Sequence, residues 1–110
     1  MAFKAGFIVM APGSDPKKHR ASIKTSKFEM TTVLVELWNV DQAVDVCKEL
    51  VHNEGIQDLV LCPGFTHEAV ARVVDAVGEK IPVSVARSDV PGVMATAEIL
   101  SNEGWLPEGH

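Results

Sequence analysis

The stretch Asp58–Val70, which reads D-L-V-L-C-P-G-F-T-H-E-A-V, most constrains what this chain can fold into. A short apolar segment runs into a Pro-Gly turn, and Thr66 then stands before a helical pattern of apolar residues as a good N-cap. This order predicts a buried strand that passes directly into a helix, the repeating unit of an α/β sheet. It also places Cys62 and His67 at the carboxyl end of that strand, where open α/β sheets usually bind ligands.

Three other segments have the character of strands. Phe3–Ala11 is a nearly continuous apolar run, typical of a central strand buried on both faces. Thr31–Trp38 has a mixed pattern that favours a strand nearer an edge, and Ile81–Ala86 is short and β-branched. With Asp58–Cys62 they predict an α/β fold with about four strands, mostly parallel or mixed. A ferredoxin-like arrangement is the minor alternative.

Three main helices are predicted by apolar residues at helical spacing. The first runs from Val40 to Val51, with Asn39 as N-cap and Gly55 as the stop. Cys47 lies on its apolar stripe and is expected in the core. The second helix runs from about His67 to Val77 and ends at Gly78, and the third from about Pro91 to Glu103. The residues expected to face inward on the second and third helices are Val70, Val73, Val74, Val77, Met94, Ala97 and Leu100.

The connection Pro12–Met30 is long for a compact domain. Because Asp15-Pro16 suits a helix start, we expect a short helix over Pro16–Ile23 or a lid. Five of the ten Lys and Arg residues lie here, with no acid between Pro16 and Phe28, although the whole chain has a net charge of −5. This basic arm, residues 17–27, suits an anionic ligand or the acidic surface of a neighbouring copy.

Length and composition limit the class of protein. The 110 residues suit one domain spanning 1–110, since a chain of this size buries enough surface to fold alone. The sequence contains neither an apolar run of about 18 residues nor a signal-peptide pattern, so we expect a cytoplasmic protein without a membrane partner. The net negative charge argues against nucleic-acid binding.

Cys62 is the sharpest candidate for chemistry. A thiol near a helix N-terminus and beside an imidazole can act as a nucleophile, with His67 or His19 as its base. The alternative is a small core residue, since a cysteine at the end of a buried strand is more often structural. Cys62 and His67 alone do not form a recognised zinc pattern, so no metal or cofactor is predicted.

A ligand site is predicted around the same sheet edge. The backbone of Gly64, Phe65 and Thr66 leads into a helix N-terminus, which favours anions. Arg87 follows an apolar strand and needs a partner, either Asp89 or an anionic ligand. Both residues are therefore candidates for the ligand site.

His19 and Arg20 lie on the basic arm, and we expect that this arm is a mobile segment that closes over the ligand site. The alternatives are a simple turn capped by Thr66, an Arg87–Asp89 ion pair and a solvated face around His19.

Several motifs together carry a family resemblance: F-x-A-G-F-I near the start, A-P-G-S-D-P-K-K-H-R, L-C-P-G-F-T-H-E and I-P-V-S-V-A-R. The chain resembles, over nearly its whole length, a small prokaryotic family of α/β proteins that is catalogued as a domain of unknown function. The resemblance implies a compact intracellular α/β domain. It implies no activity and no site residues.

Two functions from different classes remain open. One is binding of a small anionic molecule, phosphate or carboxylate, at the carboxyl edge of the sheet, with or without a reactive Cys62. The other is a homo-oligomeric structural or regulatory module, in which the basic arm pairs with a neighbour and the Trp105 region packs between subunits. The first requires Cys62, His67, His19 and Arg87 in one cavity.

Overall fold

The computed structural model describes residues 1–106. Five strands form one sheet in the order β2-β3-β1-β4-β5, with bounds β1 Phe3–Ala11, β2 Arg20–Lys24, β3 Phe28–Glu36, β4 Asp58–Leu61 and β5 Val83–Val85. The helices are α1 Val40–Glu54, α2 His67–Val77 and α3 Val93–Asn102, with a 3-10 turn η1 at Val90–Gly92. The α/β class is confirmed, with one strand more than the sequence predicted.

The sheet is mixed. Strand β1 pairs in parallel with β3 and β4, and β4 pairs in parallel with β5. Because these four strands share a direction, their carboxyl ends meet at one edge, as expected. Only the added strand β2 is antiparallel, and it pairs with β3.

Strand β2 corrects the prediction for the long connection. Residues 16–18 make a turn, and Arg20–Lys24 then forms a strand in which every residue is exposed. The predicted helix over Pro16–Ile23 is therefore wrong. A fully exposed strand leaves no alternating pattern of apolar residues, so the sequence carries little signal for it.

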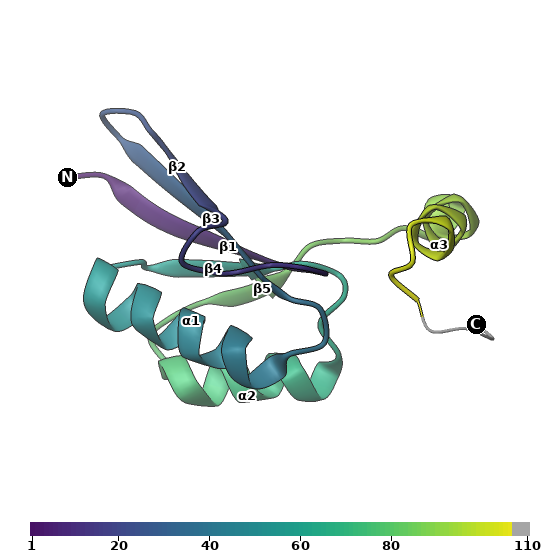
Figure 1. The fold of residues 1–110 in the computed structure, drawn as a ribbon. Coiled ribbons are helices and arrows are strands. Elements are labelled where there is room, and N and C mark those ends of the chain that lie inside the picture. The colour runs from purple at the N-terminus through teal and green to yellow at the C-terminus, as the bar shows by residue number, and fades with distance from the viewer. Residues whose placement is uncertain (107–110) are drawn as a thin grey trace.

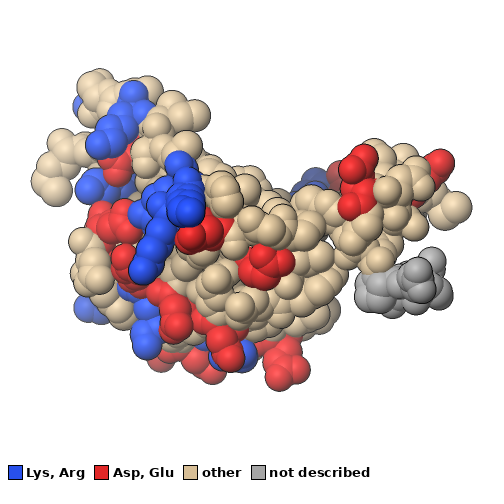
Figure 2. Space-filling view, viewed as in Figure 1, with Lys and Arg blue, Asp and Glu red and all other residues tan. Residues whose placement is uncertain are grey.

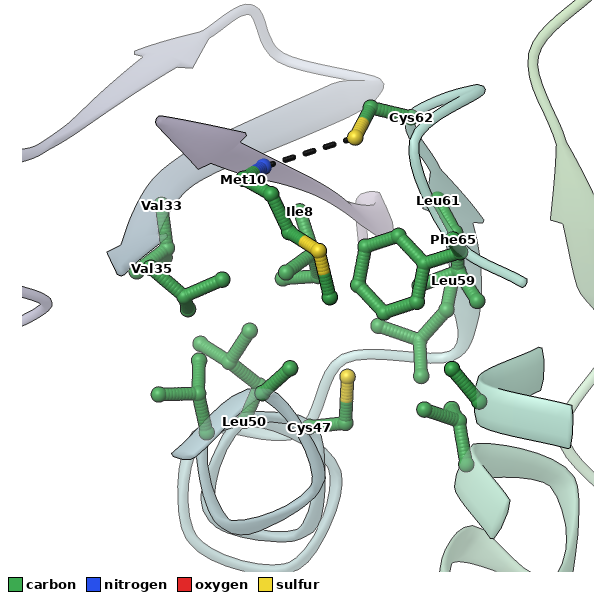
Figure 3. Close-up of a cluster of buried hydrophobic side chains, with 14 of the residues drawn as sticks. Ile8, Met10, Val33, Val35, Cys47, Leu50, Leu59, Leu61, Cys62 and Phe65 are labelled. Carbon is green, nitrogen blue, oxygen red and sulfur yellow. Dashed lines mark hydrogen bonds between the residues drawn. The ribbon is translucent and has the colours of Figure 1, made fainter. Parts of the chain in front are cut away.

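One face of the sheet carries the core. Ile8, Met10, Val33, Leu59 and Leu61 are almost fully buried, and they point from the strands toward α1 and α2 (Figure 3). Gly6 belongs to the same face, where an added Cβ would lie 3.2 Å from Leu59 Cδ2 and 3.3 Å from Ile56 Cγ2. The close packing explains why a glycine interrupts this apolar strand.

No helix within residues 1–106 lies on the other face, as Figure 1 shows. We call it the open face. Because paired residues of parallel strands point the same way, the register places Phe7 beside Val60, and Val9 beside Leu34, on this side. Phe3 and Phe28 also meet here, with ring centroids 5.4 Å apart.

Helices α1 and α2 begin and end as the sequence predicts. The Asn39 side chain accepts a hydrogen bond from the backbone N–H of Gln42, and Thr66 accepts one from Ala69. Gly55 ends α1 in the left-handed conformation, with φ of 73°. On α2 the exposure of Val74 corrects one predicted core position, whereas Val73 and Val77 are buried.

Helix α3 differs from the other two, since none of its residues is buried. It lies beyond the carboxyl edge of the sheet, at the end of an extended connection from β5 (Figure 1). Met94, predicted to face inward, is 82% exposed, so that expectation is wrong. Within residues 1–106, no helix has the length and apolar character needed to cross a membrane.

Candidate functional site

A small cavity lies at the carboxyl edge of the sheet, where sequence reasoning placed a site. Its volume is about 220 Å³. The sheet side is formed by the end of β1 and by the turns that follow β3 and β4. The other side is formed by α3, the residues after it and Ser88 in the connection from β5. The lining residues are Val9, Met10, Leu37, Trp38, Cys62, Pro63, Gly64, Ser88, Thr96, Leu100, Trp105 and Leu106. We call this hollow the edge cavity.

Cys62 contributes a buried thiol to the edge cavity. Its backbone N–H donates to the carbonyl of Ile8, which extends the β1–β4 ladder by one residue and fixes the side chain. Its Sγ accepts a hydrogen bond from the backbone N–H of Met10 at 3.4 Å (Figure 3). Cys62 is 8% exposed, so a molecule must enter the cavity to reach it.

Trp38 is held in an unusual backbone conformation at the mouth of the same cavity. Its φ is 64°, the one positive value among the non-glycine residues that the structure describes. The left-handed region costs an ordinary residue roughly 1–2 kcal/mol, and bulky side chains rarely adopt it. The indole is half exposed, so apolar surface faces both the cavity and solvent.

The three residues of the predicted ligand-binding turn have three different roles. Gly64 lines the edge cavity, whereas Phe65 is 5% exposed and belongs to the core. Thr66 caps α2 through its side chain, as in the alternative reading of a simple turn. His67 begins α2 and is exposed, and it does not line the edge cavity.

A second hollow, of about 740 Å³, lies between the basic arm and α1. It is a charged groove, with Asp15, Lys17 and Arg20 on one side and Asp41, Asp45 and Glu49 of α1 on the other. Arg20 donates to Glu54 with an Nη1–Oε2 distance of 3.1 Å, and its Nε donates to the Pro16 carbonyl. These contacts tie the arm to the end of α1.

His19 and Arg87 have partners of their own. The Nδ1 of His19 accepts a hydrogen bond from the Asp15 backbone N–H at 2.8 Å. Arg87 pairs with Asp89, with an Nη2–Oδ1 distance of 2.9 Å, and both side chains are largely exposed on the connection to α3. This is the ion pair that the sequence offered as the alternative to a ligand.

The structure therefore brings together only part of the predicted site. Cys62 and Gly64 share the edge cavity, and Arg20 lines the charged groove. His67, His19 and Arg87 line neither hollow. Sequence reasoning did not recognise Trp38, Trp105 and Leu106 as cavity walls, because they follow β3 and α3 and meet only in the folded chain.

The two cysteines have different surroundings. Cys47 is fully buried on α1, and desolvation by burial raises the pKa of its thiol to about 12. It is an inert core residue, as the helical pattern predicted. Cys62 is the thiol that borders a cavity.

Chemically, the edge cavity offers an apolar enclosure with few polar groups. Its described lining contains no residue that is charged at neutral pH, and Cys62, Ser88 and Thr96 supply its polar side chains. No cluster of three or more His, Cys, Asp and Glu side chains suited to a metal ion occurs in residues 1–106.

The fold and this hollow together define the class: an α/β domain whose mixed sheet carries helices on one face and a small apolar cavity at its carboxyl edge. The chain belongs to DUF6506, a family of unknown function whose model matches residues 3–100. The resemblance found in the sequence to a domain of unknown function is thereby confirmed. No curated protein and no solved structure shows significant similarity to the chain.

Proposed function

We propose that this chain is a small-molecule-binding domain whose site is the edge cavity. The observation that carries the proposal is the lining: a concave, largely apolar space with a few polar groups is typical of ligand sites. An apolar cavity of about 150 Å³ is enough to hold benzene. The edge cavity, at about 220 Å³, therefore has room for one ring with a small substituent.

The anionic group expected from the sequence would be held by backbone rather than by side chains. No Lys or Arg lies in the described lining of the cavity, but Gly64 in its wall leads into the first turn of α2. The unpaired N–H groups of a helix N-terminus favour negative charge. We therefore infer a compact ligand with an apolar body and one carboxylate or phosphate.

Binding is better supported than catalysis by Cys62. A cysteine nucleophile usually needs a neighbouring base, and neither His67 nor His19 lines the edge cavity. The larger charged groove is a weaker candidate, because it contains charges of both signs and Arg20 is already paired.

The proposal is tested by NMR titration of the ¹⁵N-labelled chain with three probes. Benzoate has an apolar ring and a carboxylate, benzyl alcohol has the ring alone, and inorganic phosphate has the charge alone. We expect benzoate to bind most tightly and to shift the amide signals of Cys62, Gly64 and Trp38. Unchanged signals at these residues with all three probes would refute the proposal.

A blocking variant localises the site. A Cβ at Gly64 would lie 3.6 Å from Cys62 Sγ, an ordinary contact, so Gly64→Leu would start its side chain beside the thiol that lines the cavity. We expect it to abolish benzoate binding. Ala71→Leu adds apolar bulk at an exposed position of α2 and should bind benzoate normally. Equal binding by both variants would place the site elsewhere.

A homo-oligomeric module is the second candidate function. It is favoured by a separate observation, the absence of any buried residue in α3.

A further inference from the structure

The chain leaves two apolar surfaces without a partner. One is the open face of the sheet, formed by Phe7, Val9, Met30, Leu34, Val60 and Ile23. Parallel strands occur almost only in sheets that are covered on both faces, because their residues are apolar on both sides. Here α1 and α2 cover one face, and nothing in residues 1–106 covers the other (Figure 1).

The second uncovered surface is helix α3. Val90, Met94 and Ile99 are 82%, 82% and 61% exposed. At 3.6 residues per turn, Ile99, Leu100, Val93 and Met94 together span more than half of the helix circumference. An amphipathic helix on a single core needs a narrower stripe, so α3 has apolar surface to bury beyond the part that lines the edge cavity.

Helix α3 also lacks the local features that would stabilise it alone. It has ten residues and no side-chain cap at its N-terminus. Isolated helices shorter than about 12 residues are marginal in water, so most of the stability of such a helix must come from packing. The extended connection after β5 carries α3 past the sheet edge, so most side chains of α3 have no contact surface within residues 1–106.

We propose that α3 of one copy lies on the open face of a second copy, and that the exchange is reciprocal in a two-fold pair. One chain carries both halves of the contact, so a symmetric pair covers both surfaces at once and closes the assembly. The exposed residues Val90, Met94 and Ile99 do not line the edge cavity. The α3 residues that would make the pairing are thus separate from the cavity lining, although Val9 belongs to both the open face and the cavity.

The exposed area agrees with an interface of this kind. The chain exposes 7316 Å², whereas a compact monomer of 11.9 kDa is expected to expose roughly 5,900 Å². The excess, about 1,400 Å², is larger than the roughly 800 Å² per partner of a standard specific interface. The radius of gyration, 14.6 Å, likewise exceeds the roughly 13 Å of a compact chain of this length.

Charge favours a second copy as the occupant. Helix α3 and the residue after it carry Glu98 and Glu103 and no Lys or Arg. The basic arm forms the β2 edge of the sheet. Its Lys17 lines the charged groove toward α1, whereas Lys18 and Lys27 line neither hollow and have no ion pair within residues 1–106. Figure 2 shows basic groups gathered toward the β2 end and acidic groups on α3. A reciprocal pair brings these opposite charges to the same interface.

The first test is the molar mass of the full chain, measured by light scattering between about 1 and 100 µM. We expect a dimer, and at least tenfold weaker dimerisation in Met94→Asp on α3 and in Ile23→Lys on the open face. Ile23 is 73% exposed, so its replacement leaves the core intact. Val74→Asp changes a comparably apolar, 41% exposed residue of α2 on the covered side, and should remain dimeric.

The second test identifies the occupant of the open face. Both native cysteines are first removed by Cys47→Ala and Cys62→Ala. One chain then carries Ile23→Cys, and a second chain, of different mass, carries Met94→Cys. The two chains are mixed and treated with a short bismaleimide crosslinker. We expect a crosslinked product of mixed mass. A monomer at 100 µM would overturn the proposal. A chain that carries both Ile23→Cys and Met94→Cys provides the other contradicting outcome. If it formed an intrachain crosslink while the mixture gave no product of mixed mass, α3 would cover its own sheet.

Discussion

Helices α1 and α3 lie in the same chain but differ in how they are capped and in how far they are buried. Helix α1 has a hydrogen-bonded N-cap, a glycine stop and four residues in the core, whereas α3 has no side-chain cap and no buried residue. Both are rich in apolar residues. The difference shows that the apolar content of a helix does not by itself predict whether the helix is buried by its own chain.

The same contrast separates the two faces of the sheet. The face toward α1 and α2 contains the buried residues of β1, β3 and β4 apart from Ala5, and Leu50 and Cys47 of α1 complete that core. The open face has similar apolar residues at alternate positions, but no helix of the described residues lies above it. One half of the chain is thus closed by its own helices, and the other half presents two apolar surfaces that nothing in residues 1–106 covers.

The largest effect is expected in the closed half. Leu50→Ala removes a fully buried side chain from α1, and large-to-small changes of this kind lower the free energy of unfolding by about 2–5 kcal/mol. Urea unfolding measures the loss, which should be the same at every protein concentration. A loss that varied with concentration would mean that α1 also depends on a partner.

The burial of Cys47 gives the closed half a pH dependence. The thiol has an ordinary pKa of 9.0 when unfolded and about 12 when folded. Its contribution is fully present below pH 9 and is lost between pH 9 and 12, because only the unfolded chain releases the proton there. The slope is at most about 1.4 kcal/mol per pH unit.

Unfolding of the wild type and of Cys47→Ala between pH 8 and 11 measures this contribution. The other alkaline titrations are common to both chains, so the difference between them isolates Cys47. Parallel curves for the two chains would show that Cys47 is hydrated in the folded state.

The N-cap of α1 should be worth less. Asn39→Ala removes the acceptor for the Gln42 N–H and is expected to lower the free energy of unfolding by about 1 kcal/mol. Asn39→Ser keeps an acceptor and serves as the control. If alanine and serine were equal, the helix start would be stabilised by packing rather than by the cap.

The smallest effect is expected in α3 of the monomer. Ile99→Ala changes an exposed side chain, so the unfolding free energy at concentrations where the chain is monomeric should change by less than about 0.5 kcal/mol. A loss like that of Leu50→Ala in this monomer would show that α3 packs on its own chain, and would remove the contrast between the two helices.

Part of the candidate site follows from sequence and part does not. The strand-to-helix junction predicts correctly that Cys62 and Gly64 stand at the carboxyl edge of the sheet, where the structure has a cavity. It does not predict that Trp38, Leu100 and Trp105 enclose that cavity. Those residues are far apart in the chain, and no local pattern records their contact.

The sequence by itself determines the α/β class, the order of the strand-helix units from β3 to β5, and the bounds and caps of α1 and α2. These features depend on local physics: hydrogen-bonding side chains at helix starts, glycine at helix ends, and the spacing of apolar residues. Only the tertiary structure decides that β2 is an antiparallel edge strand and that α3 leaves the body of the chain. Both depend on contacts between distant segments, because an exposed strand and an apolar helix are each compatible with several partners until the surfaces that meet them are formed.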